Sequence, residues 1–128
     1  MREVVLDTET TGLNYRSGDR VVEVGCVELI NHIATGKTLQ FYCSVDKKID
    51  EGAIKIHGLT NEFLSKHPSF EAQAEKFLNF IRKDILIIHN AEFDVGFLNN
   101  ELKIIGRGEL KNEIIDTVMM ARKTLNTR

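Results

Sequence analysis

Apolar and polar residues follow a two-residue period along the first third of the chain, which predicts strands. A β-branched apolar run predicts a buried strand over Glu3–Glu9, and apolar–polar alternation predicts a second strand over Arg20–Ile30. A glycine-containing hairpin turn over Thr35–Lys37 and a third strand over Leu39–Val45 are predicted next. Because the connections are short, we expect these three strands to form an antiparallel meander.

Helical spacing dominates the rest of the chain. We expect residues 47–58 to be irregular or to form one turn, and Thr60 to cap a short helix that follows. Apolar residues then recur at helical spacing in two longer segments, separated by an apolar run typical of a buried strand. The predicted elements are a helix from Ser69 or Phe70 to Ile81, a strand over Ile85–His89, a helix over Ala91–Ile105, a short strand over Ile114–Asp116 and a helix over Thr117–Leu125. This order predicts an α/β fold with a mixed sheet.

Length and composition are those of an ordinary soluble domain. The 128 residues predict a single domain over 1–128, with 42% hydrophobic and 28% charged residues. We expect a cytoplasmic protein with no membrane partner, because no apolar run is long enough to span a bilayer and no leader opens the chain. Cys26 and Cys43 lie in apolar stretches and are expected to be buried thiols. The net charge of −2 argues against a broad nucleic-acid-binding surface. It does not argue against an enzyme that binds only the end of a strand through a metal ion.

Asp7 and Glu9 end the first predicted strand and point to the same face of it, because strand side chains alternate. Two carboxylates so placed repel each other unless a cation or a proton intervenes. Oxygen ligands suit Mg²⁺ or Mn²⁺, so the pair is a candidate half of a metal site. The alternative is that both are ordinary solvated residues of a turn.

A second acidic element follows the predicted strand over 85–89. Asn90 is a suitable N-cap, which places Asp94 in the first turn of the next helix. Ligands of open α/β sheets bind at this end of the strands. The alternative is that Asp94 only complements the helix dipole. We expect the strands over 3–9 and 85–89 to be neighbours, because that arrangement brings the three acids together.

Three motifs occur in order: VLDTETTG at 5–12, IHGLT at 56–60 and HNAEFD at 89–94. Together they resemble the DnaQ-like 3′→5′ exonucleases, a DEDD family with a ribonuclease H-like fold, and most of all its branch that proofreads for bacterial replicative polymerases. The resemblance runs from residue 3 to about residue 125. It implies DNA as the substrate class and, as partners, a single-stranded 3′ end and a polymerase catalytic subunit.

The resemblance also implies roles for single residues. Asp7, Glu9 and Asp94 correspond to three of the family's four acids, which hold two divalent ions that activate a water and stabilise the leaving 3′ oxygen. Four further residues are implied to seat the terminal nucleotide, although Ile56 and Phe93 have core packing as an alternative: Thr8, Ile56, His57 and Phe93.

The family's third motif, a general-base His or Tyr shortly before the fourth acid, is not found. No His follows residue 89 and no Tyr follows residue 42, and Asp116 is not expected to replace the fourth acid. We therefore expect a chain truncated before that motif. Its site would lack the fourth carboxylate and the general base, and its exposed apolar face would allow self-association. The alternatives are a non-catalytic, polymerase-associated scaffold, an RNA-end exonuclease of the same fold, or an α/β domain whose acids are fortuitous.

Overall fold

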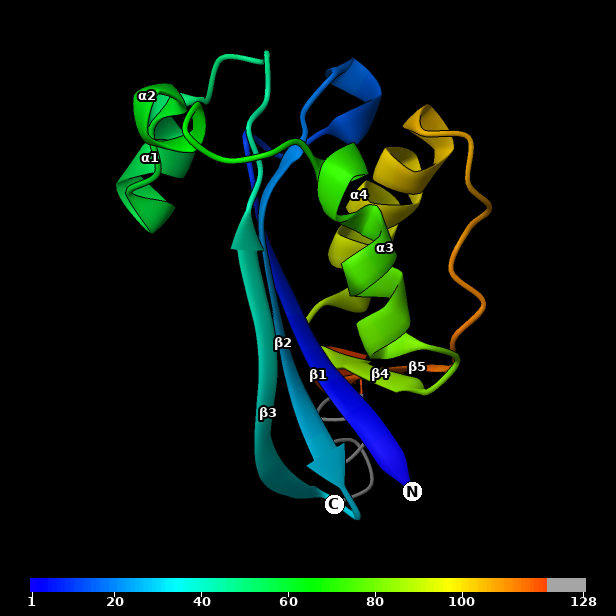
Figure 1. The fold of residues 1–128 in the computed structure, drawn as a ribbon. Coiled ribbons are helices and arrows are strands. Elements are labelled where there is room, and N and C mark those ends of the chain that lie inside the picture. The colour runs from blue at the N-terminus through cyan, green and yellow to red at the C-terminus, as the bar shows by residue number, and fades with distance from the viewer. Residues whose placement is uncertain (120–128) are drawn as a thin grey trace.

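The strands form one mixed sheet in the order β3-β2-β1-β4-β5, in a computed structural model that describes residues 1–119 (Figure 1). β1 (Arg2–Thr10), β2 (Val21–Ile30) and β3 (Ile33–Tyr42) are antiparallel neighbours. β4 (Ile85–Ile88) pairs parallel to β1, and β5 (Ile114–Asp116) pairs parallel to β4. The predicted α/β class, the antiparallel meander and the neighbouring first and fourth strands are confirmed.

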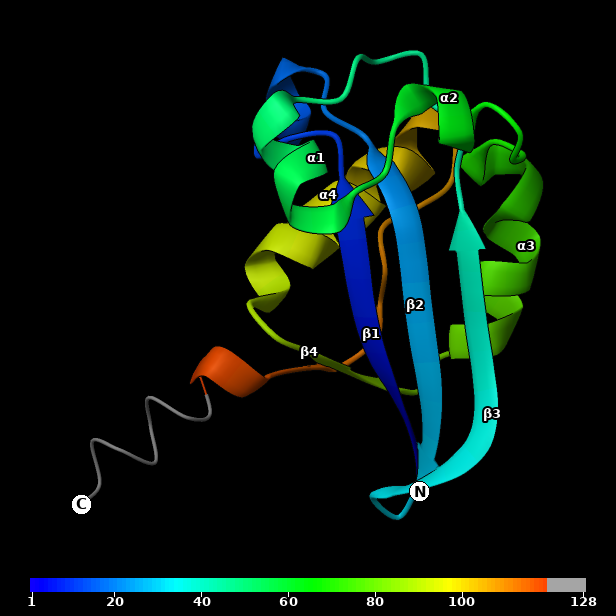
Figure 2. The same ribbon diagram turned by 90° about the vertical axis from the view of Figure 1, so that its left-hand side faces the viewer.

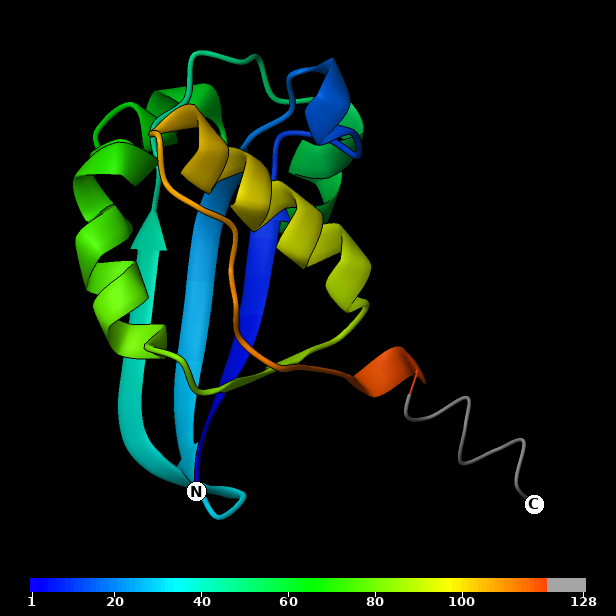
Figure 3. The same cartoon turned by 90° about the vertical axis from the view of Figure 1, so that its right-hand side faces the viewer.

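Two long helices cover one face of this sheet. α3 (Phe70–Ile81) and α4 (Ala91–Ile104) pack side by side over it, as Figures 1 and 3 show. The short helices α1 (Glu51–His57) and α2 (Asn61–Leu64) lie together at the end of the sheet where β1 finishes. Figure 2 shows that no described helix covers the long middle part of β1, β2 and β3 on the opposite face, which we call the open face.

The main core lies between the sheet and the two long helices. Val4 and Leu6 of β1 are almost completely buried, whereas Val5 between them is 37% exposed on the open face. This alternation follows from the two-residue period of a strand. Phe77 of α3 and Phe97 of α4 are among the largest side chains that the core buries. The face to which a β1 side chain points therefore determines whether α3 and α4 cover it.

A buried carboxylate fastens α4 to β2. Glu101, 1% exposed, accepts hydrogen bonds from Arg20 Nε at 2.8 Å and Arg20 Nη2 at 2.7 Å, and from the backbone N–H of Val21 at 3.0 Å. The hydrogen bonds from Arg20 and the opposite charge compensate the cost of taking this carboxylate out of water. The pair therefore sets how α4 lies across the strands.

Several predicted boundaries are wrong. The hairpin turns at Asn31 and His32, which have φ angles of 49° and 70°, and Gly36 lies inside β3. β3 therefore covers Ile33–Tyr42, because a two-residue turn with positive φ suits the strand twist. Residues 51–57 form the helix α1. It was not predicted, because Ile56 is exposed and no residue of the helix is fully buried, so its apolar residues do not mark one buried face. The predicted helix over 117–125 lies mostly outside the described residues.

The two cysteines are buried and free, as predicted. None of the helices in residues 1–119 combines the length and the apolar character that a membrane crossing needs.

Replacing Arg20 by Ala should lower the free energy of unfolding by about 3 kcal/mol, because it leaves the buried Glu101 carboxylate without its cation. Urea denaturation followed by circular dichroism measures the change. Arg107→Ala is the matched control: it removes an exposed ion pair with Glu75 and should cost no more than about 1 kcal/mol. Equal effects of the two substitutions would contradict the role given to Glu101.

Native Cys26 and Cys43 should react with a thiol reagent only as fast as the protein unfolds. Burial raises the pKa of each thiol to about 12, so little thiolate exists in mildly alkaline buffer. The rate of absorbance change with a disulfide reagent, with and without urea, tests this. Rapid modification of folded protein would show that one thiol is accessible.

Candidate metal and nucleotide site

The end of β1 carries acids on the open face. Asp7 is exposed there and Glu9 is half-buried, while Thr8 between them points to the helix-covered face and is 7% exposed. Asp7 and Glu9 line a small hollow of about 80 Å³ together with Glu23 of β2. Burial raises the pKa of Glu9, and the charge of Asp7 raises it further. The two carboxylates thus share one patch of negative potential.

Asp94 lies in the first turn of α4 and is buried, with 4% of its surface exposed. Thr8 Oγ1 donates a hydrogen bond of 2.9 Å to Asp94 Oδ1, so β1 and α4 meet at these two residues. Asp94 Oδ2 is buried and has no partner. Burial raises the pKa of Asp94 from 3.8 to about 7, opposed by the Thr8 hydrogen bond and reinforced by the charges of Asp7 and Glu9.

These carboxylates fit a divalent ion in part. Their oxygens are the ligands that Mg²⁺ or Mn²⁺ takes, and the unpartnered Asp94 Oδ2 is a donor that the fold leaves unsatisfied. Asp94 is hydrogen-bonded to Thr8, which stands between Asp7 and Glu9 in β1, so all three acids lie around the end of that strand. Within residues 1–119, however, no three His, Cys, Asp or Glu side chains come close enough together to hold one ion. The described residues therefore offer an open, incomplete set of ligands.

Asp116 has a different task from metal binding. Its carboxylate accepts hydrogen bonds from the backbone N–H groups of Asn90 at 3.2 Å, Ala91 at 3.0 Å and Val118 at 2.9 Å. Desolvation opposes ionisation of this group, but the backbone donors outweigh it and lower the pKa of Asp116. It thus caps α4. The predicted side-chain cap from Asn90 is wrong: Asn90 occupies the N-cap position with a φ of 62° and makes no capping hydrogen bond.

A cavity of about 370 Å³ opens beside these acids, and we call it the apolar cavity. All four residues implied to seat a nucleotide line it, together with Glu9: Thr8, Ile56, His57 and Phe93. They come from β1, α1 and α4, so the cavity forms only when these elements meet. Ile56 is 82% exposed, which rules out core packing for it, whereas Phe93 is half-buried against Phe97 at a ring distance of 4.8 Å.

Both ring nitrogens of His57 are already used within the protein. Nε2 donates to the carbonyl oxygen of Thr10 at 3.0 Å, and Nδ1 accepts from the backbone N–H of Leu59 at 2.9 Å. This pattern corresponds to the neutral Nε2–H tautomer. His57 therefore holds the end of α1 against the end of β1, and a ligand meets the flank of its ring unless one of these bonds opens.

Residues other than those expected to seat a nucleotide also shape the cavity. Gly12 lines it, and a Cβ there would lie 2.4 Å from Asp50 Oδ2 and 2.5 Å from Asp19 Oδ2, so a larger residue would displace these carboxylates. Asp19, 6% exposed, accepts from Thr11 Oγ1 at 2.8 Å and thereby fixes the loop after β1. Leu13, 84% exposed, stands at the rim. Of these residues only Gly12 belongs to a motif identified in the sequence, the one over 5–12.

In the presence of EDTA, the stability of the protein should fall as pH rises from about 4 to about 7. Folded Asp94 keeps its proton in this window while the unfolded chain ionises, so rising pH favours the unfolded state until the folded group also ionises. Asp94→Asn should remove this loss and be the more stable protein at neutral pH. Melting temperatures across the pH range measure it.

Glu92→Gln is the control for that measurement, because Glu92 is an exposed acid in the same helical turn. Its pH profile should follow that of the unsubstituted chain. An Asp94→Asn profile with the same slope as both would show that Asp94 titrates normally.

Comparison with known proteins shows the family. The model of the RNase T exonuclease family matches residues 4–128. The DNA polymerase III subunit epsilon of Rickettsia felis is 46% identical over 126 residues, covering 95% of this chain and 55% of the relative. That of Buchnera aphidicola subsp. Acyrthosiphon pisum is 45% identical over 129 residues, covering 95% of this chain and 54% of the relative. The chain thus spans about half the length of these curated relatives.

Solved structures agree on the fold. An apo exonuclease I superposes with a TM-score of 0.83 at 19% identity, over 94% of this chain and 30% of that one. Exonuclease X in complex with 5′ overhanging duplex DNA gives 0.73 at 24% identity, over 95% of this chain and 63% of that one. These likenesses confirm the predicted ribonuclease H-like fold. With the sequence match over nearly its whole length, the chain belongs to the exonuclease family.

Proposed function

We propose that this chain is the exonuclease part of a proofreading-type enzyme that removes nucleotides from the 3′ end of single-stranded DNA with the help of divalent ions. The observation that carries the proposal is the apolar cavity, which has Glu9 in its wall and Asp7 and Asp94 around the same strand end. A terminal base and sugar match its apolar walls. The adjoining phosphate would then lie toward the carboxylates, which it can approach only with cations between.

The residues have distinct parts in this proposal. Asp7, Glu9 and Asp94 provide oxygen ligands for Mg²⁺ or Mn²⁺, which when bound would supply the charge that activates a water and stabilises the leaving oxygen. Thr8 holds Asp94 at its Oδ1, which leaves Oδ2 directed to a ligand. Ile56 and Phe93 contact the base or sugar, and such contacts are worth about 1–3 kcal/mol per base. His57 keeps the α1 wall in place.

The incomplete set of ligands bears on the rate. Because no three ligating side chains in residues 1–119 surround one point, we expect weak ion binding and slow turnover by this chain. Asp116, the next aspartate in the sequence after Asp94, already accepts hydrogen bonds from the backbone at the start of α4.

A second candidate is a binding domain that docks a polymerase subunit or a second copy of the chain. The open face favours it: Val5 and Val27, which lie opposite each other in β1 and β2, border a largely apolar hollow of about 320 Å³ beside Asp7. Apolar surface of this kind commonly marks an interaction site. Relatives named as a subunit of DNA polymerase III support a polymerase as the partner.

With Mn²⁺, the chain should shorten a 5′-labelled single-stranded DNA one nucleotide at a time. Asp7→Asn should lower the rate by about a hundredfold or more, because it removes a metal ligand without changing shape. Asp46→Asn is the matched control at an exposed acid that lines none of the hollows around the site, and it should keep the rate. Product ladders on a denaturing gel measure the rates, and an RNA strand run in parallel tests the RNA alternative.

An activity that is equal in Asp7→Asn would come from a contaminant and would overturn the proposal. If no strand is shortened, while Mn²⁺ still raises the melting temperature of the unsubstituted chain but not of Asp7→Asn, the metal-binding scaffold is the better description. Sedimentation of the same sample shows whether the open face joins two copies.

A further inference from the structure

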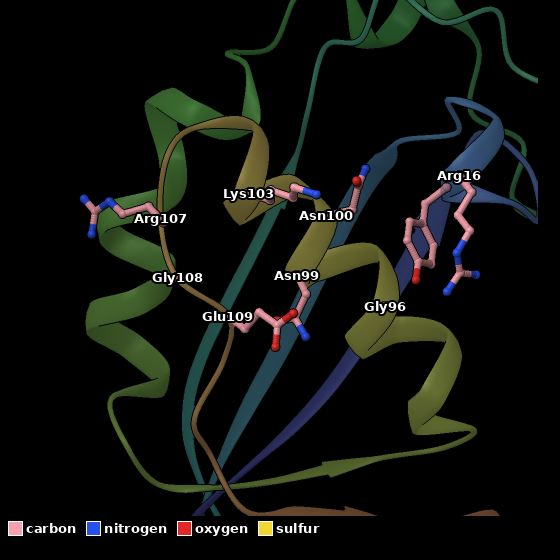
Figure 4. A pocket seen from close by; sticks show the side chains of 9 residues that line it. Arg16, Gly96, Asn99, Asn100, Lys103, Arg107, Gly108 and Glu109 are labelled. Atoms are coloured by element: carbon pink, nitrogen blue, oxygen red, sulfur yellow. The ribbon is translucent and has the colours of Figure 1, made fainter.

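A second hollow lies on the far side of α4 from the sheet (Figure 4). It has a volume of about 640 Å³ and is bounded by the 3-10 turn η1 (Tyr15–Ser17), the outer side of α4 and the loop over 107–109. We call it the α4 groove. Its polar lining contrasts with the apolar cavity and includes three cations and two amides: Arg16, Lys103, Arg107, Asn99 and Asn100.

The α4 groove is connected to the apolar cavity. A third hollow of about 330 Å³ lies between them and shares Leu13 and Phe93 with the cavity and Tyr15 and Arg16 with the groove. From Phe93 to Lys103 the path follows α4 for about 15 Å, at 1.5 Å per helical residue. One path therefore leads from the proposed seat of the 3′ nucleotide to the cationic groove.

Aromatic rings form a continuous row beneath this path. Phe93 packs on Phe97 with ring centres 4.8 Å apart, and Phe97 meets Tyr15 edge to face at 5.6 Å. The guanidinium of Arg16 lies over the Tyr15 ring, 4.8 Å from its centre. Both Tyr15, half-buried, and Arg16, exposed, offer flat surfaces on which a base stacks.

Gly96 makes room for this arrangement. A Cβ at position 96 would lie 2.9 Å from Tyr15 Cε2, so any larger residue would displace the ring from α4. Figure 4 shows Gly96 on α4 and, across from it, Arg16, which directly follows Tyr15 in η1. The position of the stacking surface thus depends on a glycine that the cavity itself does not use.

The charges along the path favour phosphate at defined points. In Figure 4, Lys103 extends along α4 toward Asn100, and Arg107 is directed to the other side, where it pairs with Glu75 of α3. Glu92 borders the intermediate hollow and Glu109 borders the groove. The exposed cations Arg16 and Lys103 beside the accessible Tyr15 ring match a phosphate next to a stacked base, whereas an acidic peptide would use the cations and leave the ring without a partner.

We propose that the α4 groove binds the single-stranded nucleic acid on the 5′ side of the terminal nucleotide, with Arg16 and Lys103 on its phosphates and the Tyr15–Arg16 pair under a base. This inference rests on the proposed function, because it takes the apolar cavity as the seat of the 3′ end. It adds a strand path and two phosphate contacts to that site.

The test compares a fluorescent thymidine mononucleotide with a short labelled oligothymidylate, in EDTA so that neither is hydrolysed. The difference between the two reports contacts beyond the terminal nucleotide, because the seat of that nucleotide is common to both. The oligonucleotide should bind more tightly to the unsubstituted chain. The Arg16→Ala/Lys103→Ala variant should lose on the order of tenfold of that gain at low salt and show a shallower salt dependence, with mononucleotide binding unchanged.

Two further variants sharpen the comparison. Lys66→Ala/Lys83→Ala removes the same charge from exposed lysines that line none of these hollows, and it should keep the full gain. Gly96→Ala leaves the charge unchanged but displaces Tyr15, and it should lose part of the gain while keeping its circular dichroism spectrum.

Equal gains in the groove variant and its lysine control would overturn the inference and leave the proposed function standing if Mn²⁺-dependent shortening is observed. Binding of neither probe, together with no shortening, would overturn both. A poly-glutamate peptide that displaces the oligonucleotide and binds more tightly would assign the groove to an acidic protein segment and overturn the nucleic-acid assignment.

Discussion

The parallel pairing of β1 with β4 is the constraint on which the site depends. Val4 lies opposite Leu86 and Val5 opposite Ile87, so both strands run toward the same end of the molecule. α4 begins three residues after β4 ends, and its first turn therefore meets the last residues of β1. A slip of one residue in this register would turn Thr8 to the open face and separate it from Asp94. Chain order and pairing together bring residues 86 positions apart within hydrogen-bond distance.

The same pairing divides the acids between two environments. Asp7 and Glu9 project from the open face, whereas Asp94 is buried beside Thr8. A buried carboxylate with one unsatisfied oxygen and like charges nearby is costly to the folded state. Glu101, on the same helix, is equally buried but is fully compensated by Arg20 and Val21. The contrast within one helix supports the proposal that Asp94 binds a cation, because the fold itself does not compensate its charge.

Local periodicity was sufficient to predict the elements that bury a regular face. β1, α3 and α4 have such faces, and their predicted bounds are nearly those observed. α1 was missed because its exposed Ile56 breaks the pattern expected of an amphipathic helix. The hairpin was misplaced because Gly36 is the more usual turn residue, while the turn that forms uses Asn31 and His32 with positive φ. Where several residues could form the hairpin turn, the pairing of the two whole strands determines which of them does.

The roles of some site residues depend on contacts between segments distant in the sequence, and sequence patterns do not reveal such contacts. Asn90 stands where a cap is needed, yet the cap is Asp116, which the pairing of Ile88 with Asp116 in neighbouring strands brings to the helix. His57 was singled out for its chemistry, yet both its ring nitrogens bond to the backbone across the β1–α1 junction. Among the buried side-chain nitrogen and oxygen atoms of the described residues, only Asp94 Oδ2 has no hydrogen-bond partner. Since folded proteins satisfy nearly all of their buried polar groups, this one unpartnered oxygen supports the proposal that Asp94 receives a ligand from outside the chain.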